Sequence, residues 1–239
     1  MERKFDGIAT GIDGLDNILD GGIPLMNSVL IAGGPGTGKT TMAFEILLNC
    51  AKEKIQCAFI TLDEKPESVI RNAEFITGKA DDIQSYIRDN VLVVDGGDSA
   101  AKVATNTESE TGYTMSNLIS DIEGIIKSVD AKVVAIDSLS FLKLMLGKTL
   151  LYNKSVSSLL SNLRRLGVTS IITLELPYYQ HSKMKFGQEL LLFDGVIALY
   201  QSRVEDKNSF EMQVVKMRGN SHERAITRYN ITDKGVKFE

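Results

Sequence analysis

The chain has few of the residues that build disulfide frameworks or histidine-based metal centres. Its 239 residues include two cysteines, two histidines and no tryptophan. Two cysteines are too few for a disulfide framework or a structural zinc site, so Cys50 and Cys57 are expected to be small apolar core residues in a reducing cytoplasm. His181 and His222 are the only histidines, which all but excludes a metal site built on several imidazoles.

Long apolar segments are scarce as well. The start, MERKFDGIATG, has no apolar stretch after its charges, which argues against a signal peptide. The run LLLFDGVIALY is interrupted by Asp194 and is too short to cross a membrane. A composition of 43% hydrophobic and 24% charged residues excludes a disordered chain, and a net charge of −4 argues against a protein that coats nucleic acid by bulk charge. We therefore expect a cytoplasmic globular protein without membrane contact, folded as a single domain over residues 1–239.

Apolar runs of strand length alternate with stretches of helical periodicity, a pattern typical of a parallel α/β sheet. Five such runs are expected strands: 27–33, 57–62, 91–95, 132–137 and 169–175. Helices are expected over 40–53, from Pro66 onward, and over 153–167 up to Gly167. Beyond these, four runs indicate antiparallel strands joined by short turns: 194–201, 209–219, 224–232 and 235–239. The predicted fold is α/β, with a mainly parallel central sheet and an antiparallel C-terminal extension, while segments 96–112 and 177–189 resist assignment.

The strongest motif is GGPGTGKT, which matches the phosphate-binding pattern G-x-x-x-x-G-K-[ST]. Its glycines allow a tight turn whose backbone N–H groups point at a phosphate, and the helix that follows adds its dipole. We expect Lys39 to reach the β- and γ-phosphates and the Thr40 hydroxyl to bind Mg²⁺, so ATP and Mg²⁺ are the expected cofactors. The expected nucleotide-binding residues here are Gly33, Gly34, Pro35, Gly36, Thr37, Gly38, Lys39, Thr40 and Thr41.

A second acid is needed to hold the metal, usually at the end of a neighbouring strand. Asp137 closes the run KVVAID and is the expected metal-binding acid, although an Asp there could instead cap the helix that follows. Asp95 closes a similar run and competes for this role. It ranks lower because Asp-Gly-Gly is typical of a turn.

Four segments outside the phosphate loop resemble the KaiC family, which belongs to the RecA-like ATPases. They are TGIDGLDNILDGGIP (10–24), ITLDEKPE (60–67), KMRGNSHER (216–224) and YNITDKGVKF (229–238). The resemblance covers nearly the whole chain and implies a RecA-like fold. KaiC proteins of clocks carry two such domains in tandem, whereas this sequence holds one and resembles the single-domain archaeal and bacterial relatives.

The resemblance implies that an acid after the second strand polarises the attacking water, which here means Asp63 or Glu64. Family members commonly have two glutamates at this place, so Asp63 is shorter by one methylene group and turnover is expected to be slow. Which of the two is the working base stays open. The alternative is an acid pair that is favoured by the helix dipole just before Pro66.

The resemblance also implies that Lys216 and Arg218 reach the γ-phosphate of a neighbouring subunit, with Ser221, His222 and Arg224 lining the outer side of the nucleotide. A cationic finger of this kind can raise the rate by roughly 10³- to 10⁵-fold. Such fingers require a ring or filament, most simply a homohexamer with ATP at each interface. The alternative is an edge strand with alternating solvated charges.

The expected function is therefore a KaiC-like ATPase that hydrolyses ATP slowly in a ring and signals its nucleotide state to an unknown protein partner. One alternative is a nucleotide-dependent scaffold with little turnover, because Asp63 is short. Another is a single-stranded DNA-binding module, less favoured, whose candidate residues are Tyr178, Tyr179, Lys183, Lys185 and Phe186.

Two weaker signals concern single positions. Glu175 ends the fifth strand and could either sense the γ-phosphate or cap the strand. The kinase domain of the clock protein carries adjacent Ser and Thr just before the strand that begins at Asp194 here. This chain has Leu-Leu-Leu-Phe at 190–193, so autophosphorylation of that type is not expected.

Overall fold

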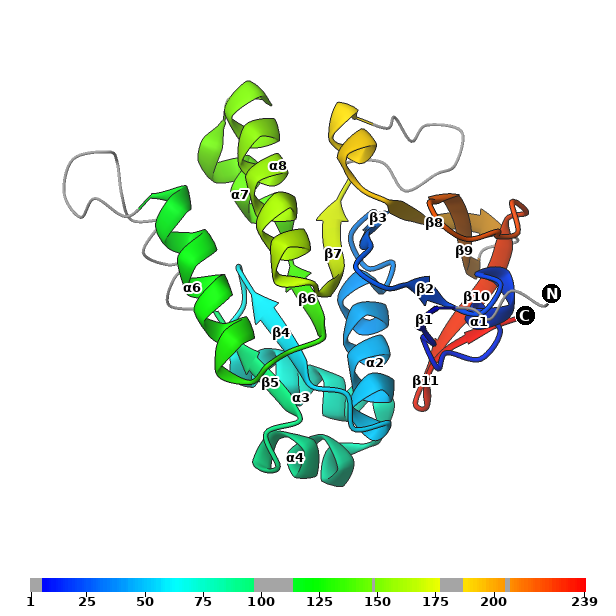
Figure 1. The fold of residues 1–239 in the computed structure, drawn as a ribbon. Helices are drawn as coiled ribbons and strands as arrows, with labels where there is room; N and C mark the ends of the chain where they lie inside the picture. The colour runs from blue at the N-terminus through cyan, green and yellow to red at the C-terminus, as the bar shows by residue number, and fades with distance from the viewer. Residues whose placement is uncertain (1–5, 97–113, 148, 177–186, 205–206) are drawn as a thin grey trace.

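The computed structural model describes residues 6–96, 114–147, 149–176, 187–204 and 207–239. A nine-stranded sheet with the order β11-β10-β9-β8-β3-β7-β6-β4-β5 forms the centre of the molecule (Figure 1). Its strands are β3 (Ser28–Gly33), β4 (Cys57–Thr61), β5 (Leu92–Asp95), β6 (Val133–Asp137), β7 (Thr169–Glu175), β8 (Gly195–Val204), β9 (Lys207–Met217), β10 (Thr227–Thr232) and β11 (Gly235–Phe238). Every strand expected from the sequence is present.

The sheet divides into a parallel and an antiparallel part. The strands from β8 to β5 pair in parallel, and β3 lies between β7 and β8. The strands β9, β10 and β11 continue the sheet in antiparallel pairing from β8. The predicted α/β fold with an antiparallel C-terminal extension is thus confirmed.

Helices cover both faces of the parallel part. The helices α2 (Lys39–Lys52), α3 (Pro66–Thr77) and α4 (Ala80–Arg88) pack into one apolar cluster, and α6 (Met115–Ser128), α7 (Leu139–Leu146) and α8 (Thr149–Leu166) into the other. Because both faces are covered, β3, β4 and β6 are buried along their whole length, which explains their unbroken apolar sequences. The expected helix starts and stops at Pro66 and Gly167 are present, with Gly167 at φ +72°.

Several elements were not predicted from the sequence. These are α4, α6, α7, the helix α1 (Leu15–Ile18), the short ribbon of β1 (Gly7–Ile8) and β2 (Ile23–Pro24), and the 3₁₀ helix η2 (Gln188–Leu192). Several boundaries also differ: α8 begins at Thr149 rather than 153, β8 ends at Val204 rather than 201, β9 spans Lys207–Met217 rather than 209–219, and β10 begins at Thr227 rather than 224. In the part of the chain that the structure describes, no helix is long and apolar enough to cross a membrane.

Candidate active site

The phosphate loop leaves the carboxyl end of β3, in the middle of the sheet. At Gly33 a Cβ atom would come within 2.7 Å of both the Leu199 carbonyl oxygen and the Thr37 hydroxyl. Only glycine therefore fits at this position. Gly38 precedes α2 at φ +84°, in the left-handed region that favours glycine. The Thr37 hydroxyl donates to the Gly34 carbonyl at 2.8 Å and closes the loop on itself. These contacts hold the loop at the N-terminus of α2, where helix N–H groups favour an anion.

Lys39 is the first residue of α2 and is buried. Its ammonium group donates to the Gly34 carbonyl at 2.9 Å and lies 3.9 Å from a carboxylate oxygen of Glu175. Burial lowers the pKa of Lys39, although the nearby carboxylates of Glu175, Asp137 and Asp63 oppose the shift. The lysine therefore spans the loop that a phosphate would enter, with the Glu175 carboxylate beside it.

Asp137 lies at the end of β6, buried beside the loop. One carboxylate oxygen accepts a hydrogen bond of 2.8 Å from the Thr40 hydroxyl, and the other accepts one from Thr173. A carboxylate and a hydroxyl that face one pocket are the hard oxygen donors that Mg²⁺ takes beside a phosphate. These residues thus fit a magnesium ion. The competing acid, Asp95, instead accepts the N–H of Gly96 at 2.6 Å, as expected for a turn.

Asp63 and Glu64 follow β4 and line the same pocket. The Thr61 hydroxyl fixes this turn, since it accepts the Glu64 N–H at 3.1 Å and donates to the Glu64 carbonyl at 2.9 Å. The Asp63 carboxylate accepts a hydrogen bond of 3.3 Å from Ser138. Although the residue as a whole is exposed, partial burial of its carboxyl raises the pKa of Asp63, and the charges of Asp137 and Glu64 add to this.

The loop, the acid pair and Asp137 line a single pocket of about 410 Å³. Its wall includes two apolar side chains, Ile76 of α3 and Ile231 of β10. A Cβ atom at Gly38 would come within 2.4 Å of the Ile231 side chain, so the C-terminal extension lies directly against the loop. The buried Tyr229 donates its hydroxyl to the Thr37 carbonyl at 2.5 Å. Ile76, Tyr229 and Ile231 were not predicted from the sequence to lie at the loop; the last two fall in the segment 229–238 that resembles the KaiC family, which carried no site prediction.

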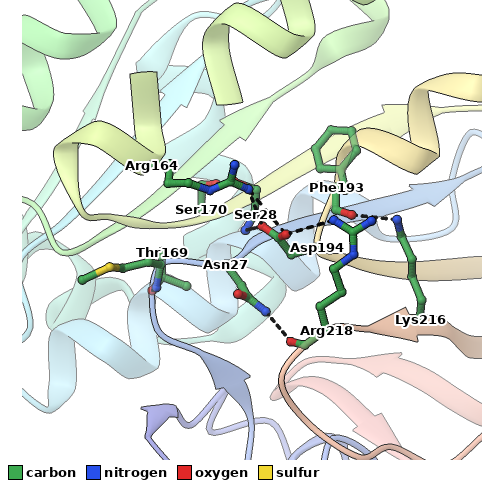
Figure 2. Close-up of polar contacts among 10 residues, drawn as sticks. Asn27, Ser28, Arg164, Thr169, Ser170, Phe193, Asp194, Lys216 and Arg218 are labelled. Atoms are coloured by element: carbon green, nitrogen blue, oxygen red, sulfur yellow. Dashed lines mark hydrogen bonds and ion pairs between the residues drawn. The ribbon is translucent and has the colours of Figure 1, made fainter. Parts of the chain in front are cut away.

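Lys216 and Arg218 lie away from this pocket, at the end of β9. Met217 pairs with Gly195, and Gly195 lies beside Val29 near the start of β3, whereas the phosphate loop follows the other end of that strand. The six residues of β3 separate the two places by roughly 17 Å along the strand. The Lys216 ammonium group donates to the Phe193 carbonyl at 2.6 Å, and Arg218 pairs with Asp194 at 3.4 Å (Figure 2). Burial, and then the charge of Arg218, lower the pKa of Lys216.

Of the other predicted residues in the KMRGNSHER segment, His222 and Arg224 lie near Lys216 and Arg218. A shallow pocket of about 380 Å³ is lined by these two residues together with His222 and Arg224. Ser221 turns instead to Asp20, to which its hydroxyl donates at 2.6 Å. The site residues predicted from the sequence therefore lie in two places, around the phosphate loop and around the end of β9. The aromatic and basic residues considered for DNA binding, 178–186, lie outside the described residues.

Comparisons with known proteins decide the family. The family model for the KaiC ATPase matches residues 8–239. The chain belongs to the KaiC family of ATPases. As a member of this family it is a nucleotide-binding protein with a RecA-like fold, as the resemblance implied.

Individual relatives agree with the KaiC assignment. A UPF0273 protein of Aeropyrum pernix is 36% identical over 97% of this chain and 92% of its own length. The circadian clock oscillator protein KaiC of Synechococcus elongatus is 28% identical over 96% of this chain but only 43% of its own length. Among solved structures, the KaiC-like protein PH0186 of Pyrococcus horikoshii has a TM-score of 0.84 at 25% identity and covers 99% of this chain and 100% of its own.

Proposed function

We propose that this KaiC-family chain binds ATP with Mg²⁺ in the phosphate-loop pocket and hydrolyses it slowly to ADP and phosphate. It does so in a homo-oligomeric ring, most simply of six subunits, with the nucleotide at subunit interfaces. The nucleotide state of the ring is then passed to a protein partner. The cytoplasmic location and the single-domain organisation stay predictions.

The binding half of the site is formed by one subunit. Backbone N–H groups of Gly36–Thr40 and the Lys39 ammonium group would hold the phosphates, while Thr40 and Asp137 would hold the metal. Bound Mg²⁺ supplies positive charge that neutralises the β- and γ-phosphate oxygens. Because Lys39 is buried and its pKa is lowered, a phosphate provides the counter-charge that this ammonium group partly lacks.

The acid pair supplies the proton acceptor for the attacking water. Asp63 is favoured over Glu64 because it accepts a hydrogen bond from Ser138, the neighbour of the metal-binding Asp137. A raised pKa also makes this carboxylate a stronger base than an ordinary aspartate. The oxygen donors in the pocket thus take separate roles, with Asp137 toward the metal and Asp63 toward the water.

The observation that carries the interfacial part of the proposal is the position of Lys216 and Arg218 at the opposite end of β3 from the phosphate loop. Within one chain these cations are too far from the γ-phosphate to touch it. In a head-to-tail ring, one face of a subunit meets the other face of the next, so two such half-sites can combine. Ser221, His222 and Arg224 would then face the outer side of the same nucleotide.

The experiment is a mass measurement with and without Mg-ATP, followed by phosphate release from the assembled species. We expect a ring with ATP, and a turnover per subunit that rises with assembly. Subunit mixing tests the interface directly. The variants Lys39→Ala and Arg218→Ala should each be inactive alone, and their mixture should regain activity, since some interfaces combine an intact loop with an intact finger. Failure of that mixture to hydrolyse ATP would overturn the interfacial site.

A second candidate is a nucleotide-dependent scaffold with little turnover. The short side chain of Asp63, which is engaged with Ser138, favours this view. An Asp63→Glu variant distinguishes the two, because a marked rise in phosphate release would mean that reach limits the native protein. Single-stranded DNA binding rests on residues outside the described part of the chain and stays a prediction.

A further inference from the structure

Asp194 lies immediately before β8 and is almost fully buried, at 7% exposure. One carboxylate oxygen accepts the backbone N–H of Ser28 at 3.1 Å, at the first residue of the strand that leads to the phosphate loop. The two main chains are joined there as well, since the Asp194 N–H donates to the Ser28 carbonyl at 2.9 Å. The carboxylate is therefore fixed to the central strand.

Two arginines approach this carboxylate from opposite sides (Figure 2). Arg164, in the last turn of α8, lies 3.2 Å from the oxygen that also accepts Ser28. Arg218 lies 3.4 Å from the other oxygen, and its backbone N–H donates to the Asp194 carbonyl at 3.0 Å. Both guanidinium groups are more than half exposed, so only the shared carboxylate is buried.

The same turn also holds the second cation of the proposed interface. The Lys216 ammonium group donates to the carbonyl of Phe193, the residue just before Asp194. Residues 193 and 194 thus orient both Lys216 and Arg218. A guanidinium group has five N–H donors in a rigid fork, so Arg218 can keep one bond to Asp194 while others face a phosphate.

We infer that Asp194 and Arg164 are positioning residues for Arg218, and that they act through it on the nucleotide of the neighbouring subunit. This inference rests on the proposed interfacial ATPase. Arg164 holds the carboxylate from one side, at 3.2 Å from one oxygen and 3.5 Å from the other, and so fixes the position of the oxygen that orients the Arg218 guanidinium group. Neither residue touches the nucleotide, and both act through Arg218.

A purely structural role for Asp194 makes a different prediction. If the carboxylate only pinned β8 to β3, its loss would disturb the phosphate loop of its own subunit, which follows β3. If Asp194 is a positioning residue, its loss leaves that loop intact and displaces only the Arg218 guanidinium group that would reach the neighbouring subunit. Subunit mixing separates the two, because each half-site can be supplied by a different chain.

The first test uses Asp194→Asn, which keeps the size of the side chain. Alone, this variant should assemble with ATP and keep its KM for ATP, while kcat falls by roughly 10- to 100-fold, the loss expected from a misplaced catalytic group. Mixed in equal amounts with Lys39→Ala, it should regain about a quarter of the wild-type rate, since about one head-to-tail interface in four combines an intact loop with intact fingers.

The mixture of Arg218→Ala with Lys39→Ala is the reference. If the reference regains activity and the Asp194→Asn mixture does not, Asp194 acts on its own loop and the inference is wrong while the interfacial ATPase stands. If the reference mixture itself stays inactive, the proposed interfacial ATPase is wrong, and the inference that rests on it is wrong with it. Equal recovery in both mixtures supports the inference.

A second variant avoids the buried carboxylate, whose loss could prevent folding. Arg164→Gln removes an exposed guanidinium group, and we expect kcat to fall by roughly 3- to 10-fold with KM unchanged and activity regained on mixing with Lys39→Ala. The matched control is Arg165→Gln, on the same helix turn, where the native arginine pairs with Glu123 at 2.7 Å. Equal losses of kcat in the two arginine variants, or a loss in Arg164→Gln that mixing does not relieve, would overturn the inference.

Discussion

The hydroxyl of Thr40 donates a hydrogen bond of 2.8 Å to the carboxylate of Asp137, joining the start of α2 to the end of β6 across 97 positions of the chain. Thr173 on β7 donates to the other oxygen of the same carboxylate, so a helix and the neighbouring strand together orient it. The protein's own hydroxyl groups thus hold the carboxylate in place. Such preorganisation is what electrostatic stabilisation of a phosphoryl transfer requires.

Asp137→Asn should abolish most of the hydrolysis. The amide is nearly isosteric and can still accept the Thr40 hydroxyl, but it lacks the negative charge that faces the metal. We expect kcat to fall by roughly 10²- to 10³-fold, as when one preorganised electrostatic group is removed. Phosphate release at saturating Mg-ATP measures the effect. Asp95→Asn makes the same change at the end of β5 and should alter kcat by less than about twofold. Equal losses in both variants would contradict the assignment of Asp137.

Asp63 should produce an acid limb in the pH–rate profile. A base works only when deprotonated, so activity is lost as pH falls through its pKa. Partial burial, with Asp137 and Glu64 nearby, raises the pKa of Asp63 above its ordinary value of 3.8, so the midpoint of this limb should lie above that value. Asp63→Asn should lower kcat by roughly 10²- to 10⁴-fold, the usual contribution of a general base. Glu64→Gln is the comparison, and the reverse ranking of the two variants would make Glu64 the working base.

Tyr229→Phe should weaken both the fold and the nucleotide site. It removes the hydroxyl that donates to the buried Thr37 carbonyl at 2.5 Å, which leaves that acceptor without this donor. We expect a loss of about 1–2 kcal/mol in the free energy of unfolding and a several-fold weaker affinity for ATP. Denaturant unfolding and nucleotide titration measure the two effects. Tyr200→Phe is the control, because this buried tyrosine donates to Gln213 instead. Tyr200→Phe should lower the free energy of unfolding without lowering the affinity for ATP. An equal loss of ATP affinity in both variants would disprove the role of Tyr229.

Glu45 should make stability depend on pH. This buried side chain of α2 accepts the Val236 N–H at 2.7 Å, and burial raises the pKa of Glu45 above its ordinary value of 4.5. The part of its stabilising contribution that is linked to protonation is therefore fully present below pH 4.5 and is lost as pH rises through the raised pKa, whereas the hydrogen bond from Val236 does not require the proton. Glu45→Gln keeps an acceptor without a charge, so its free energy of unfolding should fall less over this range than that of the native chain.

The same position also tests how β11 is attached to α2. Glu45→Leu removes the acceptor of Val236 and should cost about 1–3 kcal/mol at neutral pH. Glu53→Leu, at the exposed end of the same helix, should change stability by less than about 0.5 kcal/mol. Denaturant unfolding compares the two variants. If Glu45→Leu were as stable as Glu53→Leu, the hydrogen bond would not hold β11 on α2.

Local patterns in the sequence were enough to predict the strands of the sheet and the phosphate loop. The strands β3, β4 and β6 are buried on both faces, so their sequences are mostly apolar. The motif GGPGTGKT contains the glycines that its tight turn requires. The helices α4 and α6 were not predicted although both are amphipathic: Ile83 is buried in α4, and Leu118, Ile122 and Ile126 recur at helical spacing in α6. Their apolar stripes are a periodic signal that the prediction did not use.

The low counts of cysteine and histidine already restricted this protein to chemistry without a disulfide framework or an imidazole-rich metal site. The phosphate-loop motif and the order of the strands along the chain were likewise readable from local residue types, which also favoured Asp137 over Asp95. Which residues meet in space was not. Lys216 and Arg218 lie at the other end of β3 from Lys39, and Asp194 joins Arg164 to Arg218, because strand pairing brings together segments far apart in sequence. Such contacts arise from the packing of the whole sheet, so only the tertiary structure decides them.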